Sequence, residues 1–487
     1  MGIFAENGAR WTNRAIPSIL PLVNVLFINV AQSIIAVFLA SDFIRRDKKL
    51  DTTEVIYARP VSNGEYVAGK TIGILQLFIG LVFLVLSMGL LFNLVLKDTP
   101  VVWTAYLFYP LLISLPSLVF ILGLSFFMMI LFRNQAVTFV VLLGYIGLTI
   151  FYFKDKLHGL LDYMAFNLPM VYSDLIHFAD LPNILLQRSA YLLLGIGFIF
   201  ATIRFLGRLP QVGKWNGLNL AGFIIFLAAG LFAGYTFLAG FSRQEKDRTE
   251  FLALNNAFAG KAVPDIISNS LDLSQYGNSL TISSELMIRN QNEGRLDTLI
   301  FSLNPGFEID SITGESGPLH FERDRQILLV FPENGLDQGR RMRCRIFYHG
   351  VPLESISYLD IHKKKLASQV RIQVATLDRK PGIVKPDFML LTSELFWYPV
   401  AGVGFNLKNF QPQEMDFVRY SISLKPGKGL RAVAPGRSEE KDGIQRFRPD
   451  ADLPVFPLVI GPFEKRSIRV DNVEYNLFLK PDHDYFS

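Results

Sequence analysis

Residues Ala105–Phe132 read AYLFYPLLISLPSLVFILGLSFFMMILF, a stretch without a single charged side chain. The hydrocarbon core of a bilayer is about 30 Å thick, so roughly 20 apolar residues of helix are enough to cross it. Only helices and closed barrels satisfy their backbone polar groups in lipid. The stretch therefore predicts a membrane-spanning helix.

Stretches of the same kind recur along the first half of the chain. They are Ile16–Ala40, Thr71–Leu96, Ala136–Phe153, Ala190–Leu206 and Gly217–Phe241. Together with Ala105–Phe132 they predict a polytopic α-helical membrane domain of about six spans over residues 16–241. The chain has 487 residues, which is too long for one typical domain, and the charged residues gather outside these spans.

The overall composition excludes several classes of site. A net charge of +5 is modest and does not indicate a nucleic-acid partner. Cys344 is the only cysteine, so the sequence allows neither an intrachain disulfide nor a zinc site built on cysteines.

The loops between the spans indicate the topology, because Lys and Arg favour the cytoplasmic side. The loop 41–70 carries the strongest basic cluster, namely Arg45, Arg46, Lys48, Lys49, Arg59 and Lys70. We therefore expect this loop inside, in a bacterial inner (plasma) membrane. Alternation then places the N-terminal tail 1–15, the loop 154–188 and everything after Phe241 outside. The loop 154–188 is too polar to span, and its apolar residues suggest a segment that lies on the membrane or caps the bundle.

After a charged run at Arg243–Arg248, a connector over residues 242–265 leads to a region of alternating apolar and polar residues. The apolar positions of Leu280–Ile288 and of Val418–Leu424 recur every second residue, which predicts half-buried strands. Further strands are expected at Thr298–Leu303, Gln326–Phe331, Cys344–Tyr348, Val370–Ala375, Phe456–Ile460 and Ser467–Leu479. Residues 266–487 are thus expected to form an all-β antiparallel domain outside the membrane, as a sandwich or a saddle-shaped sheet.

The segment Gly64–Thr71 spells the phosphate-loop pattern G-x-x-x-x-G-K-T. That pattern binds phosphate only between a strand and a soluble helix. Here a turn around Pro60 precedes it and a predicted span follows it, so nucleotide binding is not expected. The preceding loop suits a short helix over Phe43–Tyr57, with Ser62 capping the next helix. That helix is either a solvated carrier of topology-setting charges or a surface for a cytoplasmic partner.

The runs Asp42–Asp47, Arg59–Ser62 and Tyr66–Lys70 resemble permease subunits of ABC-2-type transporters. The resemblance implies a cytoplasmic coupling helix that contacts a separate ATP-binding subunit, with ATP and magnesium on that partner and two permeases forming a homo- or heterodimer. The residues that would make the coupling contact are Arg45, Arg46, Asp47, Glu54, Pro60, Ser62, Tyr66, Gly69 and Lys70. The first predicted span matches the second span of that family, so we expect a first span to be missing from this chain.

The β-rich half is similar to the N-terminal β domain of aminopeptidase-N-type zinc peptidases. The similarity rests on the order of Leu303–Phe307, Phe321–Asp324, Phe347–Gly350, Glu394–Pro399 and Val459–Glu464. In that family a catalytic domain with a His-Glu-x-x-His motif holds zinc, and no two of the six histidines here have that spacing. We therefore expect no catalytic, cofactor-binding or metal-binding residue on this chain.

Three functions remain open from the sequence. The first is the permease subunit of an ATP-driven transporter, and the second is the membrane anchor of a zinc aminopeptidase whose catalytic domain is not in this chain. The third is a non-catalytic outside scaffold with a purely anchoring membrane region. Within the first span, Asn24, Asn29 and Gln32 share one broad face, which predicts hydrogen bonds between helices rather than a substrate path.

Overall fold

The structure is a computed structural model that describes residues 16–49, 62–96, 101–206, 216–359, 361, 370–372, 375–377, 380–403, 417–471 and 473–481. It divides into two compact units. The first comprises the described parts of residues 1–242 and 369–378, and the second comprises those of residues 243–368 and 379–487. Each unit is described by itself.

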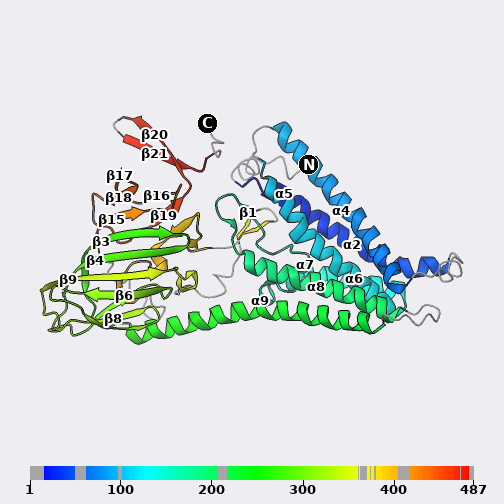
Figure 1. Cartoon of the computed structure of the whole chain (residues 1–487), viewed down its shortest axis with the longest axis horizontal. Coiled ribbons are helices and arrows are strands. Elements are labelled where there is room, and N and C mark those ends of the chain that lie inside the picture. The colour runs from blue at the N-terminus through cyan, green and yellow to red at the C-terminus, as the bar shows by residue number, and fades with distance from the viewer. Residues whose placement is uncertain are drawn as a thin grey trace. The chain divides into compact units, whose positions relative to one another are not determined.

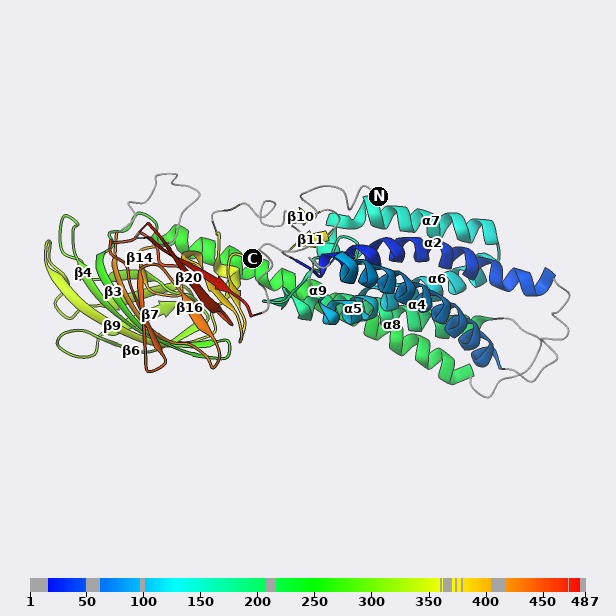
Figure 2. The same cartoon turned by 90° about the horizontal axis from the view of Figure 1, so that it is seen from above.

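Helices form the first unit, as the sequence predicts (Figure 1). They are α2 (Ile19–Lys49), α4 (Asn63–Leu96), α5 (Trp103–Tyr109), the π-helix η2 (Pro110–Ser114), α6 (Leu115–Phe132), α7 (Gln135–Phe151), α8 (Leu181–Phe205) and α9 (Asn216–Phe258). Among the described residues, five helical stretches are long and apolar enough to cross a membrane, and α7 is a shorter apolar helix. Figure 2 shows α2 between α4 and α7.

Two helices continue beyond the apolar stretches that predict them. The apolar part of α2 ends at Ala40, yet the helix runs on to Lys49, so the separate short helix expected to begin at Phe43 is wrong. Helix α9 likewise continues through the charged run at Arg243–Arg248, so the connector is helical as far as Phe258. Hydropathy shows where the apolar stretch ends, but the helix continues for as long as its backbone hydrogen bonds continue.

Helices α6 and α8 cross at a close contact between two glycines. A methyl group on Gly123 would lie 2.3 Å from the carbonyl oxygen of Gly195, and one on Gly195 would lie 2.6 Å from the backbone of Phe120. Such a close approach excludes any larger side chain at these positions. Small residues serve this purpose in helix pairs within membranes, where close packing replaces the hydrophobic drive for association.

The segment between α7 and α8 caps one end of this bundle, which confirms one of the two arrangements that the sequence suggests. It contains η3 (Phe153–Asp155), η4 (Leu157–Gly159) and the short pair β1 (Tyr172–Ser173) and β2 (His177–Phe178). Tyr163, Met164 and Met170 are completely buried, and they join the apolar clusters formed by the helices. We call residues 157–180 the cap loop.

The second unit is built of β-sheets that follow the C-terminal part of α9 (Figures 1 and 2). The largest sheet has the order β17-β18-β15-β3-β4-β9-β6. Its strands are β3 (Asp265–Tyr276), β4 (Ser279–Arg289), β6 (Phe307–Thr313), β9 (Arg341–Gly350), β15 (Arg419–Lys425), β17 (Arg437–Lys441) and β18 (Ile444–Arg448). Among the described pairings, β3 with β15 is parallel and the others are antiparallel, so the purely antiparallel expectation is wrong at this one pairing.

Two smaller sheets complete the core of the second unit. One has the order β14-β5-β8-β7, with β5 (Leu299–Ser302), β7 (His320–Asp324), β8 (Ile327–Phe331) and β14 (Val400–Ala401). The other has the order β12-β13-β19-β16, with β12 (Ile383–Val384), β13 (Met389–Leu391), β16 (Arg431–Val433) and β19 (Leu458–Gly461). Their apolar residues join those of the largest sheet in one cluster, which includes the fully buried Trp397.

The predicted faces of the strands are confirmed, whereas two predicted strands are wrong. The alternate residues from Leu280 to Ile288 in β4 and from Val418 to Leu424 at β15 are buried. Residues Ser467–Leu479 do not form one strand but belong to a hairpin of β20 (Glu464–Val470) and β21 (Val473–Leu479). Residues Val370–Ala375 are likewise divided between β10 (Val370–Ile372) and β11 (Ala375–Leu377), which belong to the first unit.

Candidate functional site

The helical unit buries one arginine at the meeting point of several elements. Arg188 lies two turns inside α8 and is 2% exposed. Its Nε donates to the Leu112 carbonyl at 2.7 Å, and Nη2 donates to the Ile113 carbonyl at 3.0 Å and to Ser117 Oγ at 2.7 Å. Its Nη1 donates to the Tyr163 carbonyl at 2.8 Å and to Gln187 Oε1 at 3.2 Å. A guanidinium has five N–H donors, and all five are used.

The sequence makes the Leu112 carbonyl available by interrupting the helix between α5 and α6. In an α-helix the Leu112 carbonyl would accept from the amide of residue 116, which is Pro116 and has no N–H. The preceding π-helix, Pro110–Ser114, shifts the bonding pattern by one residue in the same region. The guanidinium of Arg188 thus supplies donors where the helix cannot.

Polar side chains of α2 connect to the same point. Asn29 Nδ2 donates to Ser117 Oγ at 3.1 Å and to the Met164 carbonyl at 2.9 Å. One helical turn away, Gln32 Nε2 donates to the Phe78 carbonyl of α4 at 2.9 Å. The expected role of these α2 amides in hydrogen bonds between helices is confirmed for Asn29 and Gln32.

The cap loop is held to α8 by the neighbour of Arg188 in the sequence. Gln187 Nε2 donates to the carbonyls of Asp162 at 2.9 Å and of Gly159 at 3.3 Å. The Asp162 carboxylate is fully buried and accepts from the Asn167 amide at 2.6 Å. Desolvation raises the pKa of Asp162, and the hydrogen bonds from the loop and the charge of Arg188 oppose that rise only in part.

This arrangement, which we call the Arg188 network, joins α2, α6, α8 and the cap loop. Because every guanidinium donor is occupied, Arg188 has none left for a ligand in this conformation. Among the described residues, no group of histidine, cysteine and carboxylate side chains could hold a metal ion. The network is therefore suited to fix the relative positions of helices, and a change in one helix would be felt by the others.

Sequence reasoning missed Arg188 because its hydropathy window began at Ala190 and left the arginine in the outside loop. The correct start was readable from local signals. Asp180 caps α8 by accepting from the Asn183 amide at 3.4 Å, and Pro182 lies in the first turn. An Asp followed by a proline in the first helical turn is a typical helix start. These signals would have moved Arg188 into the span.

Those of the predicted coupling residues that the structure describes lie at the C-terminal end of α2 and at the N-terminal end of α4. Arg45, Arg46 and Asp47 belong to the helical extension of α2 beyond Ala40, whereas Glu54 and Pro60 lie outside the described residues. The structure therefore does not show the two helix ends joined into one surface.

Ser62 caps α4, as predicted. Ser62 N and Oγ both contact Glu65 Oε2, at 2.7 and 2.9 Å, while the Glu65 amide donates to Ser62 Oγ at 3.2 Å. This reciprocal pair is a capping box. Farther along the first turns, Lys70 Nζ lies 5.4 Å from the centre of the Tyr66 ring, and a side chain on Gly69 would meet nothing within 4 Å.

The same segment settles the phosphate-loop pattern. Residues 64–70 already lie in α4, which begins at Asn63. Their amides after the first turn are therefore used inside the helix and cannot wrap a phosphate group as a loop would. The segment Gly64–Thr71 thus matches the phosphate-loop pattern in sequence but does not form its loop.

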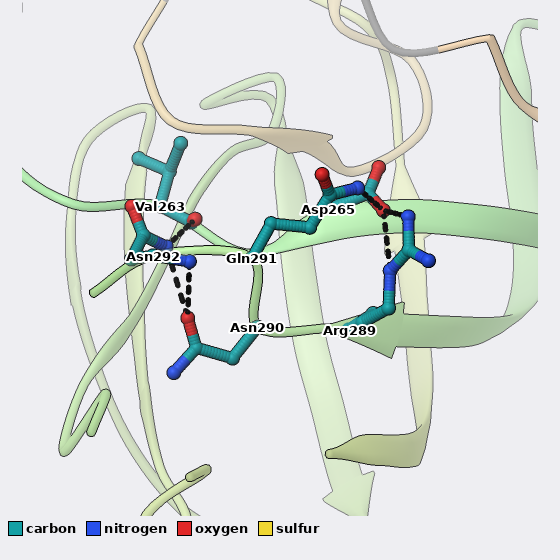
Figure 3. Close-up of polar contacts among 6 residues, drawn as sticks. All are labelled: Val263, Asp265, Arg289, Asn290, Gln291 and Asn292. Atoms are coloured by element: carbon teal, nitrogen blue, oxygen red, sulfur yellow. Dashed lines mark hydrogen bonds and ion pairs between the residues drawn. The ribbon is translucent and has the colours of Figure 1, made fainter. Parts of the chain in front are cut away.

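A second polar cluster lies in the β unit, where the chain passes from α9 into β3 (Figure 3). Arg289 donates to Asp265 Oδ2 at 2.8 and 3.2 Å, and Gln291 contacts the same oxygen. Asn292 Nδ2 donates to the Val263 carbonyl at 2.7 Å and to Asn290 Oδ1 at 3.1 Å. Arg289 neutralises the Asp265 carboxylate, and the Asn292 amide holds the backbone carbonyl of Val263. The cluster therefore fixes the start of β3.

Comparisons with known proteins give a partial likeness. No protein-family model matches the sequence, and no curated protein matches it. An M1 zinc metallopeptidase from Deinococcus radiodurans shares 16% identity at a TM-score of 0.32, over 43% of this chain and 45% of that one. A mutant of that enzyme bound to a Tyr-Ser-Ala substrate shares 15% identity at a TM-score of 0.32, over 44% of this chain and 46% of that one. A mutant two-domain M1 zinc metallopeptidase bound to L-arginine shares 15% identity at a TM-score of 0.30, over 45% of this chain and 47% of that one.

The chain thus spans a little less than half the length of these structures. They come from the class of peptidase that the motifs of the β-rich half resemble. A TM-score near 0.3 is too low to support an argument about fold or activity.

Proposed function

We propose that the chain is the permease subunit of an ATP-driven transporter of the ABC-2 type, with its β unit outside the membrane. The observation that carries the proposal is the extension of α2. Its apolar part ends at Ala40 and the helix continues to Lys49, which at 1.5 Å per residue amounts to about 13 Å of charged helix beyond the span. Arg45, Arg46 and Asp47 lie on this extension, which we expect to face the cytoplasm.

The interior of the bundle supports the same proposal. A force applied at the extension of α2 acts along one continuous helix, and the same helix carries Asn29 into the Arg188 network. Movement of α2 would therefore be passed to α6, α8 and the cap loop through hydrogen bonds. An ATP-driven permease requires such a connection between its cytoplasmic and outer ends.

The partner in this proposal is a cytoplasmic ATP-binding subunit that holds ATP and magnesium. Two permeases, identical or related, would enclose the conduit in a bacterial inner membrane. The described residues carry no catalytic role in the proposal, and ATP hydrolysis belongs to the partner.

The test is purification of the full chain from its native membranes, followed by assay of Mg-ATP hydrolysis in the purified complex. We expect ATPase activity to accompany the unaltered chain and to be lost when Arg45 and Arg46 are both changed to Glu. The matched control changes Arg243 and Lys246 to Glu, because these exposed basic residues of α9 lie on the side expected to be outside. Equal association of ATPase activity with all three chains contradicts the proposal.

A second candidate is favoured by the hairpin β20–β21. Its apolar residues share one face and are about half exposed or more, and they are Ile468, Val470, Val473, Tyr475 and Leu477. The opposite face is polar apart from Phe478, with Lys465 beside Glu474 at 3.5 Å and Ser467 bonded to Asn476 at 2.7 Å. A two-stranded hairpin is marginal by itself in water. A further folded domain covering this face would fit the anchor of a zinc aminopeptidase.

The sequence of the gene downstream of Ser487 distinguishes this candidate from the first. A His-Glu-x-x-His motif there, with a distal glutamate, would make the full protein a membrane-anchored peptidase as well as a permease. A stop codon would remove the peptidase candidate and leave the transport proposal unchanged.

A further inference from the structure

Helix α4 turns two glycines away from the rest of the helical unit. Gly73 and Gly80 are exposed, and a methyl group on either would meet no described atom within 4 Å. Gly89 of the same helix shows the opposite case, because a methyl group there would lie 2.8 Å from the side-chain nitrogen of Asn24 in α2. Packing inside the unit therefore explains the glycine at position 89 but not those at positions 73 and 80.

The outward glycines belong to a pattern that repeats every seven residues. Gly73, Gly80 and Ser87 form one series at this interval, and Gln76 and Phe83 form a second series between them. All five residues are exposed. Positions that alternate three and four residues apart lie along one face of a helix, as in the seam of a coiled coil. We call these five residues the α4 seam.

The α4 seam contains a polar side chain within an apolar run. Residues 71–96 have no charged side chain, and Gln76 lies about 9 Å along the helix from Lys70. The other amide side chain of this run, Asn93, is buried and donates to the Tyr106 hydroxyl at 3.4 Å. Gln76 is exposed instead, and it forms no hydrogen bond with the described part of the chain. In a membrane an outward amide without a partner is unfavourable, so Gln76 indicates a protein surface rather than lipid against the seam.

Helix α9 provides a comparison within the same unit. From Leu218 to Phe232 each of its exposed residues is apolar, as expected of a face covered by lipid. Its glycines in this range pack against α8. A methyl group on Gly222 would lie 2.8 Å from the Phe200 ring, and one on Gly230 would lie 2.8 Å from the Leu194 side chain. The outward glycines and the outward amide of α4 therefore differ from what the lipid-facing side of α9 shows.

A second copy of the same helix accounts for both features of the α4 seam. A glutamine side chain has donors and an acceptor, so two Gln76 side chains related by a twofold axis can bond to each other. The glycines on either side of Gln76 allow two backbones to approach closely, as small residues do in helix pairs within membranes. Lipid chains offer no hydrogen bond, and a different protein would need its own polar group at the same depth.

We propose that the α4 seam is the surface through which two copies of this chain pair in the membrane, with the two Gln76 side chains bonded to each other. This pairing rests on the proposed function, because it requires the helical unit to lie in a membrane, and it gives the two proposed permeases a defined contact. The seven-residue period predicts a left-handed crossing, in which the two helices stay in contact from Gly73 to Ser87.

The test measures cross-linking between copies of the full chain in membranes. Cys344 is changed to Ala to remove the native thiol, and either Ser87 or Met88 is then changed to Cys. Both positions are exposed at nearly the same depth, but they point about 100° apart around the helix. Copper phenanthroline oxidises pairs of cysteines that reach disulfide distance, and a non-reducing gel measures the dimer. We expect Ser87→Cys to form the dimer at least about fivefold faster than Met88→Cys.

Two further changes test the α4 seam in the chain that carries Ser87→Cys. Gly80→Leu places a large side chain between the two backbones, and Gln76→Leu removes the amide pair. We expect the first to lower the rate of dimer formation by about fivefold or more and the second to lower it as well. The matched control is Gly144→Leu in α7, because Gly144 is also exposed and a methyl group there would meet no described atom within 4 Å. It should leave the rate unchanged.

Equal rates at positions 87 and 88 overturn the pairing, because random encounters between copies would then explain the dimer. Equal losses from Gly80→Leu and Gly144→Leu also overturn it. A disulfide from position 87 to a different protein, in place of the dimer, overturns the choice of a second copy. The ATPase assay is a separate measurement: a dimer without associated ATPase activity contradicts the transport function alone, whereas ATPase activity without the dimer contradicts the pairing alone.

Discussion

Each unit places an arginine against backbone carbonyls, and the two sites differ in how completely water is excluded. In the helical unit, Arg188 uses all five donors inside the bundle. In the β unit, the half-buried Arg323 donates to the carbonyls of Arg325 at 2.9 Å and Asn304 at 2.6 Å and contacts that of Phe307. Desolvation lowers the pKa of Arg323 to about 10.

The difference shows what an arginine contributes in each surrounding. Arg323 is half-buried and one of its acceptors lies in the exposed turn at Arg325, so water can enter the space left when the guanidinium is removed, although Asn304 and Phe307 are themselves buried. Carbonyls near Arg188 lie in a helix interrupted by Pro116 and in the buried cap loop, where an unpaired group has no replacement. Loss of the hydrogen bonds from arginine to carbonyls should therefore lower the free energy of unfolding more in the helical unit than in the β unit.

The largest effect is expected from Arg188→Leu. Removal of the guanidinium takes away the donors to the Leu112, Ile113 and Tyr163 carbonyls and leaves the buried Asp162 without its nearby positive charge. We expect a loss of about 3–5 kcal/mol in the stability of the helical unit. Thermal unfolding of the full chain in detergent measures it, with the exposed Arg243→Leu as control. Arg188→Lys should be intermediate, because lysine has three donors in place of five.

A smaller effect is expected from Arg323→Leu. Because Arg323 is half-buried, water can enter the space that its side chain leaves, so the loss should be about 1–2 kcal/mol, in the range of a few hydrogen bonds. Urea unfolding followed by tryptophan fluorescence reports this change in a chain whose Trp11, Trp103 and Trp215 are changed to Phe, because the remaining Trp397 is buried in the β unit. If Arg323→Leu costs as much as Arg188→Leu, exclusion of water is not what separates the two sites.

A still smaller effect is expected at the start of α4. Ser62→Ala removes the capping box with Glu65 and should destabilise the helical unit by about 1 kcal/mol. Ser62→Asp retains a capping oxygen and serves as the matched control in the same melting experiment. A loss in both variants would mean that the hydroxyl itself, and not capping, matters at this position.

The smallest effect concerns pH and Asp162. A raised pKa means that the folded chain holds the proton more tightly than the unfolded chain, so this carboxyl lowers stability as the pH rises above its unfolded pKa of about 3.9. Asp162→Asn should therefore raise the melting temperature at pH 7, and the gain should shrink as the pH falls toward 4. A gain that grows toward acid pH would reverse the sign assigned to desolvation.

Sequence patterns predicted those parts of the two units where one simple period dominates. Alternation from Leu280 to Ile288 fixes the buried face of β4, and uninterrupted apolar runs mark the helices. The position of Arg188 inside a helix was not predicted, because hydropathy is averaged over a window and a single buried charge makes the apolar stretch seem to begin too late. The position of β11 could not be predicted either, since Ala375 and Thr376 are too short a signal to show that they leave the β unit.

The coupling residues show a different limit. Capping by Ser62 was predictable because its partner Glu65 lies three residues away in the sequence. The continuity of α2 was not, because the change from apolar to charged residues after Ala40 suggested a separate helix from Phe43, whereas the helix continues from the apolar span before it. Propagation of a helix already formed needs far less from each residue than starting a new one.

The π-helix at Pro110–Ser114 is equivalent to one extra residue inserted into an α-helix. Deleting one residue there would restore regular winding and turn the preceding segment, Trp103–Tyr109, by about 100° relative to α6. Tyr109, whose hydroxyl accepts from the Tyr172 amide at 2.9 Å, would then point away from the cap loop. Contacts on both sides of the π-helix therefore fix the number of residues between Tyr109 and α6. We expect insertions and deletions here to be far less tolerated than substitutions.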